Sequence, residues 1–267
     1  MNWSTALRDE LSTRAKAWAQ RQGAPHYLSL GREPTVLFEP YAGGTSHGNF
    51  HPESWKVICA KADWARRLEK PHQRKRALPI DKQDTAKELD SCNSSDALLM
   101  NCFCFPGVGT PLLGGSTHRS SSPVFGIPAR LWLADGRPDA TELDMRLGGY
   151  IVEAKLTEAD FTARPEEHVL RYKGLASCFD VSALPRRSGS ILGYQLIRNV
   201  LAAAQLETQL VVLIDARRPD LLEAWWRIHA TISDSTLRGR CGFRTWQEVA
   251  ANSPSSLREF LHQKYGL

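Results

Sequence analysis

The chain has 267 residues, 42% of them hydrophobic and 24% charged, so it can bury a core of its own. It has no run of 18 apolar residues, which argues against a membrane-spanning protein. Its formal net charge of +5 suits a polyanionic partner such as nucleic acid but does not require one. The first 20 residues are amphipathic and contain acids instead of the apolar core of a signal peptide, so we expect a cytoplasmic protein.

Residues 1–90 predict a helical and loop region that packs on or extends the main domain. Helices are expected over 3–21 and 52–68, separated by a stretch rich in Gly, Pro and Ser. The basic run 66–76 follows the second helix and has two interpretations. It is either a solvent-exposed surface or a contact for phosphate groups, and the sequence favours neither.

The cysteines raise the alternative of a zinc site. Cys92, Cys102 and Cys104, followed by His118, offer four possible ligands in order. Cys102 and Cys104 lie, however, in the apolar run ALLMNCFCF, and no second CxxC accompanies them. We therefore favour buried, reduced thiols over metal ligands.

Residues 91–267 predict the main domain. A helix capped by Ser94 or Ser95 comes first, followed by strands over 124–134, 139–147 and 150–157 and by a helical segment over 164–179. A strongly periodic helix over 191–207 leads into a buried strand at 209–215, and helices are expected over 219–232 and 253–266.

The stretch ELDMRLGGYIVEAK, residues 142–155, predicts a β-hairpin with an unusual charge distribution. If Gly148 and Gly149 form a two-residue turn, Leu147 pairs with Tyr150, and every further pair follows by counting. The count places Asp144 opposite Glu153, and Glu142 opposite Lys155. All four charged side chains then lie on one face of the hairpin, above an apolar opposite face.

Two carboxylates directly opposite each other destabilise a hairpin unless one binds a proton or a cation lies between them. Oxygen ligands favour a hard divalent ion such as Mg²⁺ or Mn²⁺, and Lys155 is within reach of a water or phosphate oxygen held by that ion. This combination indicates phosphodiester hydrolysis. The plainer alternative is a solvated hairpin whose Glu142–Lys155 pair is an ordinary surface ion pair.

Asp144 followed by Glu153-Ala154-Lys155, within this order of elements, resembles the PD-(D/E)XK nuclease superfamily. The resemblance covers residues 91–216 and implies an α/β fold, restriction-endonuclease-like, with an αβββαβ core and a mixed central sheet flanked by helices. The sequence SSDALLMN upstream and GYQLIRN downstream is similar to a poorly characterised bacterial branch of these presumed endonucleases.

The resemblance also implies roles for individual residues. Asp144 and Glu153 would bind Mg²⁺ or Mn²⁺, with the backbone carbonyl of Ala154 facing the ion. Lys155 would orient or help to activate the attacking water. The further candidates are Asp96, Glu88 and Glu142 for the metal, Gln195 for catalysis, and Arg198 and Lys173 for the substrate.

We therefore expect a metal-dependent nuclease, most simply a DNA endonuclease. One alternative is a protein of this fold that binds nucleic acid without cutting it. Another is a structural or interaction domain whose charged hairpin is surface decoration, in which case Asp144 and Glu153 point into solvent. The sequence leaves open DNA against RNA, endo- against exonucleolytic cutting, and whether the protein is a homodimer.

Overall fold

The computed structural model describes residues 2–115, 122–139 and 142–267. The chain forms two compact units, one made of residues 1–120 with 246–267 and the other of residues 121–245. No helix within these described ranges is long and apolar enough to cross a membrane.

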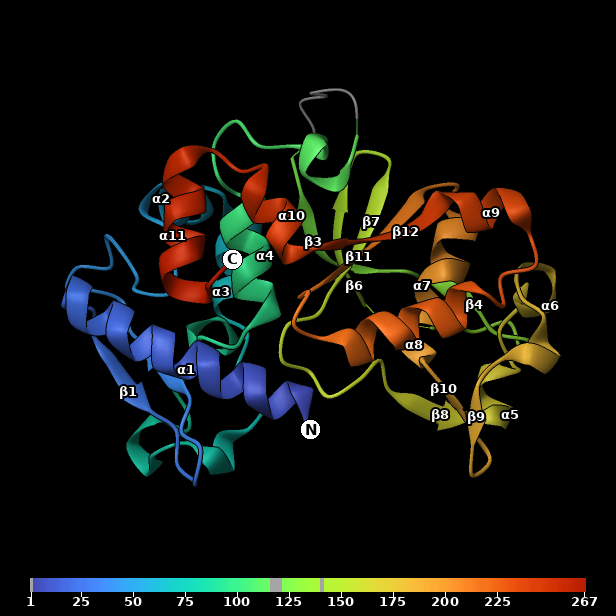
Figure 1. Cartoon of the computed structure of the whole chain (residues 1–267), viewed down its shortest axis with the longest axis horizontal. Coiled ribbons are helices and arrows are strands. Elements are labelled where there is room, and N and C mark those ends of the chain that lie inside the picture. Colours follow the sequence, from blue (N-terminus) through green and yellow to red (C-terminus); the bar gives the residue numbers. More distant parts are fainter. Residues whose placement is uncertain (1, 116–121, 140–141) are drawn as a thin grey trace. The chain divides into compact units, whose positions relative to one another are not determined.

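The first unit contains helices, short 3₁₀ turns and one two-stranded sheet (Figure 1). Its elements are α1 (Trp3–Gln22), β1 (His26–Leu28), β2 (Val36–Phe38), α2 (Pro52–Ala60), α3 (Ala62–Leu68), η1 (Lys75–Ala77), η2 (Ile80–Lys82), η3 (Glu88–Asp90), α4 (Ser95–Phe103), η4 (Thr110–Leu113), α10 (Trp246–Ala251) and α11 (Ser255–Tyr265). The predicted helix 52–68 is interrupted at Lys61, whose extended backbone (φ −111°, ψ 112°) separates α2 from α3. Ser94 caps α4 as expected, since its hydroxyl accepts the Ala97 amide at 3.1 Å.

The C-terminal helices and α4 belong to the first unit, although the sequence placed them in a main domain of residues 91–267. Helix α11 packs against α1. Its Lys264 is 1% exposed, and the Lys264 Nζ donates to the backbone carbonyl of Asn49 at 2.9 Å. Such contacts join segments more than 200 residues apart, and no local sequence pattern announces them.

Lys264 is expected to make the stability of the protein depend on pH. Burial drives its pKa well below the ordinary value of 10.5, against a smaller opposing effect of Cys92. Between the lowered pKa of the folded chain and 10.5, the unfolded chain therefore binds a proton that the folded chain has released. Unfolding binds protons in that range, so the free energy of unfolding rises as the pH approaches 10.5, by up to about 1.4 kcal/mol per pH unit.

This pH dependence can be measured by denaturant unfolding of the wild type and of Lys264→Met between pH 7 and 10. The wild type should gain stability relative to the variant as the pH rises, because other titrating groups cancel in the difference. Two curves that stay parallel would contradict the prediction.

The cysteine prediction concerns the same unit. Cys92, Cys102 and Cys104 are 2%, 0% and 2% exposed, which agrees with buried thiols. Burial raises the pKa of the Cys102 thiol and so disfavours the thiolate that zinc requires. His118, the remaining ligand of the zinc alternative, lies outside the described residues.

The second unit is built on a five-stranded mixed sheet, whose strands follow the order β12-β11-β7-β6-β3 and are labelled in Figure 1. Its elements are β3 (Val124–Pro128), β4 (Leu131–Trp132), β5 (Pro138–Asp139), β6 (Glu142–Leu147), β7 (Tyr150–Ala154), β8 (Ala163–Pro165), α5 (Glu166–Val169), α6 (Leu175–Cys178), η5 (Val181–Ala183), β9 (Arg186–Arg187), β10 (Ser190–Leu192), α7 (Tyr194–Gln205), β11 (Gln209–Ile214), α8 (Pro219–His229), α9 (Ser235–Arg240) and β12 (Cys241–Thr245). Strands β12, β11 and β7 are parallel, and the β7–β6 and β6–β3 pairs are antiparallel.

The expected α/β fold with a mixed central sheet is confirmed, and the sheet strands and long helix that were predicted follow in the expected order as β3, β6, β7, α7 and β11. The predicted strand 124–134 is divided into β3 and β4, which lie in different sheets, and the short strands β5, β8, β9 and β10 were not predicted as separate elements. The predicted helix 191–207 begins only at Tyr194, because Ser190–Leu192 form the middle strand of a three-stranded sheet (β8-β10-β9) and Gly193 (φ 72°) turns the chain. The helical segment 164–179 is reduced to the two short helices α5 and α6. Strand β12 was not predicted; it pairs in parallel with β11.

The register of the β6–β7 hairpin is as predicted over the three pairs of its ladder, which ends before the expected Asp144–Glu153 pair. Leu147 pairs with Tyr150, Arg146 with Ile151, and Met145 with Val152, around a turn in which Gly148 has a φ of 57°. Strand β6 alternates between exposed and buried positions, whereas β7 is buried from Ile151 to Ala154. Both strands are internal to the sheet, but β7 is its middle strand and helix α7 packs against it.

Candidate active site

Glu153 and Lys155 form a buried ion pair at the end of β7. They are 2% and 5% exposed, and the Lys155 Nζ lies 2.7 Å from the Glu153 Oε1. The ring of Phe161, itself 1% exposed, lies 5.8 Å from the same nitrogen and helps to shield the pair from water. Removing two charges from water in this way destabilises the fold unless each charge is compensated. The pair therefore lowers the stability that apolar residues could provide at this point.

Asp144 lies where the hairpin ladder ends. Continuing the ladder beyond Met145–Val152 would direct the Ala154 amide to the carbonyl of Leu143. The amide instead donates to the Asp144 Oδ2 at 2.8 Å. The Asp144 carboxylate thus replaces a main-chain acceptor, which fixes the half-buried side chain beside the end of β7.

Helix α7 covers the face of β7 that carries Glu153. Asn199, which is 0% exposed, donates from Nδ2 to the Glu153 Oε2 at 2.7 Å. Each oxygen of Glu153 therefore has its own partner, Lys155 for Oε1 and Asn199 for Oε2. Asn199 was not predicted, because Gln195 and Arg198 were the polar residues that the pattern of this helix singled out. The signal that could have identified it is its spacing, since Asn199 follows Gln195 by one helical turn.

Lys155 remains a cation in this environment. Desolvation by burial, the largest single effect, favours the neutral amine. The carboxylates of Glu153, Glu158 and Asp144 together outweigh it and raise the pKa of Lys155 above its ordinary value of 10.5. The side chain is therefore a charged hydrogen-bond donor at neutral pH and not a proton acceptor.

The other site residues predicted in this unit differ in burial and in the contacts they make. Arg198 is 3% exposed, and its guanidinium donates to the Glu142 carbonyl at 3.2 Å, so it braces the start of β6. Gln195 is half-buried near the start of α7, and Glu142 and Lys173 are exposed. The expected Glu142–Lys155 pair is superseded by the Glu153–Lys155 pair in the structure.

Asp96 and Glu88 belong to the first unit. The Asp96 Oδ2 lies 2.9 Å from the Arg67 guanidinium and 3.4 Å from the Lys70 Nζ, which also approaches Glu88 at 3.0 Å. These ion pairs give both carboxylates a structural role within their own unit. A role for either in metal binding stays a prediction.

The groups at the end of the hairpin fit a hard cation in their chemistry. Asp144 and Glu153 supply carboxylates, and the carbonyl of Ala154 points towards β6, as its amide does. Mg²⁺ is commonly held by one or two carboxylates and retains several waters. Among the described residues no three His, Cys, Asp or Glu side chains gather so as to hold a metal, so two carboxylates are the set available.

The mixed sheet and this hairpin define the class of the protein as restriction-endonuclease-like α/β. The chain belongs to the family described as restriction endonuclease associating with ARP, whose model matches residues 14–266. The match extends over both units. No curated protein and no solved structure matches the chain.

Proposed function

We propose that the chain is a metal-dependent nuclease of the PD-(D/E)XK type that cuts DNA internally. The observation that carries the proposal is the buried Glu153–Lys155 pair at the point where Asp144 ends the hairpin ladder. A folded domain without a use for these charges would gain stability from apolar residues there. The family to which the chain belongs supports a nuclease reaction.

In this proposal Asp144, Glu153 and the carbonyl of Ala154 hold Mg²⁺ or Mn²⁺. The bound ion would lower the pKa of the attacking water and neutralise charge that develops on the phosphate. Lys155 donates a hydrogen bond to the water or to a phosphate oxygen, since its raised pKa keeps it charged. Its task is to orient and to stabilise charge, and general-base catalysis by this lysine is disfavoured.

Helix α7 has a supporting part. Asn199 positions Glu153 through the 2.7 Å hydrogen bond and leaves the carboxylate with one fixed orientation. Gln195 lies one turn earlier on the same face of α7, and we assign it a contact with the substrate or the attacking water. Arg198 positions β6, and Lys173 is an exposed cation available to phosphates.

The alternatives fit the geometry less well. An interaction domain with a decorated surface requires Glu153 in solvent, whereas its side chain is 2% exposed. A nuclease fold that only binds nucleic acid does not need Asp144, Glu153 and Lys155 together. This second alternative differs from the proposal in activity alone, so the assay decides between them.

The test uses the purified full chain with supercoiled plasmid, single-stranded DNA and RNA, each with Mg²⁺, Mn²⁺ or EDTA. We expect plasmid nicking or linearisation with either metal and none with EDTA, while DNA binding in EDTA persists. Binding without cleavage of any substrate would overturn the nuclease proposal. Cleavage of RNA alone would retain the reaction and correct the substrate.

A further inference from the structure

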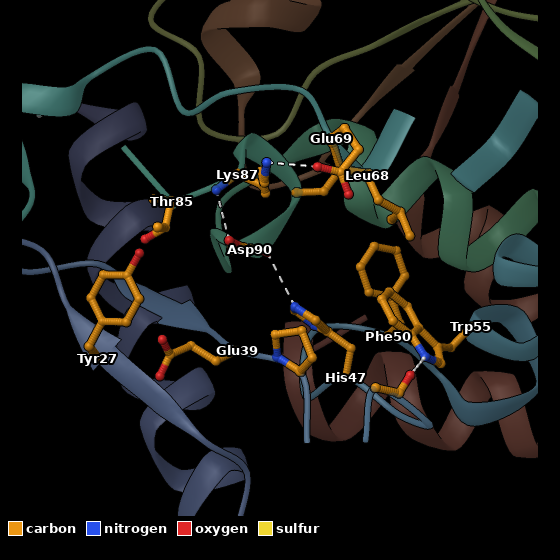
Figure 2. A pocket seen from close by; sticks show the side chains of 14 residues that line it. Tyr27, Glu39, His47, Phe50, Trp55, Leu68, Glu69, Thr85, Lys87 and Asp90 are labelled. Carbon is orange, nitrogen blue, oxygen red and sulfur yellow. Dashed lines mark hydrogen bonds and ion pairs between the residues drawn. The ribbon is translucent and has the colours of Figure 1, made fainter. Parts of the chain in front are cut away.

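The first unit contains a cavity of about 410 Å³ that the proposed reaction does not use. Figure 2 shows Tyr27 and Glu39 on one side of it, with His47, Phe50 and Trp55 on the other. The rings of these last three pack together, with centroids 5.0–5.4 Å apart. A volume of this size is typical of small-molecule pockets and much larger than a site for a single ion or water.

The charges that line the cavity exclude an anionic occupant. Glu39, Glu69 and Asp90 contribute carboxylates to the wall, against the cation of Lys87. Burial, and then the carboxylates of Asp90, Glu39 and Asp81, raise the pKa of Tyr27 to about 12. The charged groups that raise this pKa are all acids, although the Lys82 Nζ lies 5.2 Å from the centre of the Tyr27 ring, and a phosphate inside the cavity would meet repulsion.

The carboxylates of the cavity wall do not require a ligand with a full positive charge. Glu39 is paired with Lys82 at 2.6 Å, and Glu69 with Lys87 at 2.7 Å. Two charges are thereby neutralised within the protein, which leaves Asp90 as the acidic group of the wall. A neutral ligand that offers hydrogen-bond donors satisfies such a wall.

Asp90 is held so that it can accept from a ligand. Its Oδ1 lies 3.2 Å from the His47 Nε2, and its Oδ2 accepts the Lys87 amide at 2.8 Å. Each carboxylate oxygen has a second lone pair for a further donor. Across the cavity, the Tyr27 hydroxyl is shielded from solvent and has no hydrogen-bond partner among the described residues. An unpaired buried hydroxyl costs about 1–3 kcal/mol, so a ligand that pairs with it gains affinity.

The basic run lies directly beside this cavity. Pro71 forms a β-bridge with Lys87, and the His72 amide donates to the Ala86 carbonyl at 3.0 Å. Lys87 and Ala86 both line the cavity. Arg74, Lys75 and Arg76 follow along the chain and are exposed. The surroundings therefore combine an aromatic, acceptor-bearing interior with cations outside it.

We propose that this cavity binds one nucleobase, with its amino group directed to Asp90, its ring against the aromatic wall and its phosphates towards Arg74–Arg76. The inference rests on the proposed function for the source of the base, which would be a nucleotide turned out of the DNA substrate. A free nucleotide offers the same chemistry. Guanine, adenine and cytosine carry an amino group and should be preferred to thymine.

Calorimetric titrations in EDTA test this inference without any hydrolysis. The ligands are the four deoxynucleosides, a single-stranded 12-mer, and a duplex with 2-aminopurine whose fluorescence rises when the base leaves the stack. We expect weaker binding of thymidine than of the other nucleosides. Tyr27→Phe should weaken binding of the preferred bases roughly fivefold, as the loss of one hydrogen bond predicts, and should not lower thermal stability.

Thr85→Trp places a bulky ring at an exposed position on the wall of the cavity and should abolish nucleoside binding. Thr13→Trp, at an exposed position on α1, is its matched control and should bind as the wild type does. If the 12-mer binds through the cavity and free nucleosides do not, the base comes from nucleic acid. If nucleosides bind as well, a free nucleotide is also a ligand.

The inference is overturned if no base-containing ligand binds, or if Thr85→Trp binds all of them as tightly as the wild type. Its failure is separable from that of the nuclease proposal. A protein that cuts DNA but shows no cavity-dependent binding keeps the reaction and loses this site. A protein that binds bases and cuts nothing keeps the site and loses the reaction.

Discussion

The variants Glu153→Ala and Lys155→Ala are each expected to cut DNA at least about 1,000-fold more slowly than the wild type. The first loses a metal-binding carboxylate and the second loses a charged donor, and either loss removes several kcal/mol of transition-state stabilisation. The rates are to be measured on plasmid with Mg²⁺ under single-turnover conditions. The double variant should be no slower than the slower single one, because both residues act on one event.

Both single variants should also be less stable than the wild type. Each single variant leaves one charge buried without its 2.7 Å partner, at a cost of about 3–5 kcal/mol. Removing both charges should cost less than the sum of the two single changes, and a denaturant double-mutant cycle measures that difference. A double variant whose loss equals the sum would show that the pair is not coupled.

Glu223→Ala and Arg227→Ala form a matched control pair in the same unit. These residues are an i,i+4 ion pair on α8 with side chains 64% and 62% exposed. Each change should leave hydrolysis intact and alter stability by no more than about 0.5 kcal/mol. Comparable losses of activity in this pair would indicate a general effect of charge instead of a local one.

The hairpin could be predicted from the sequence because its information is local. The Gly148-Gly149 turn fixes the register, and period-two alternation sorts the side chains, as the observed β6–β7 pairs show. Local sequence information does not reveal that β7 is a central strand. Glu153 and Lys155 were therefore expected on an open face of the hairpin, whereas the structure buries both.

The remaining differences concern contacts between distant segments. Asn199 meets Glu153 across 46 positions of sequence, and Lys264 meets Asn49 across 215. Periodicity identified α7 and α11 as helices but did not show which neighbour each polar residue would contact. Strand β12 was missed for a similar reason, since its five residues gain their partners only from β11.

Arg218→Ala is expected to destabilise the second unit by about 3–5 kcal/mol. The Arg218 side chain is 0% exposed, and its guanidinium donates to the carbonyls of Leu156 and Ala159 at 3.1 and 3.3 Å. It also binds both carboxylate oxygens of Asp220, at 2.9 and 2.8 Å. The guanidinium thus holds the segment that follows Lys155, and its removal leaves the buried Leu156 carbonyl without this donor and creates a cavity.

Denaturant unfolding measures this loss, with two further variants as comparisons. Arg218→Lys keeps the charge but cannot reproduce the planar fork, so it should recover only part of the stability. Asp220→Asn should cost less than Arg218→Ala, because the buried guanidinium loses its counter-charge but keeps its hydrogen bonds to the carbonyls of Leu156 and Ala159. If Arg218→Ala were as stable as Asp220→Asn, the segment after Lys155 would be held by its own packing, and the clamp would have no structural role.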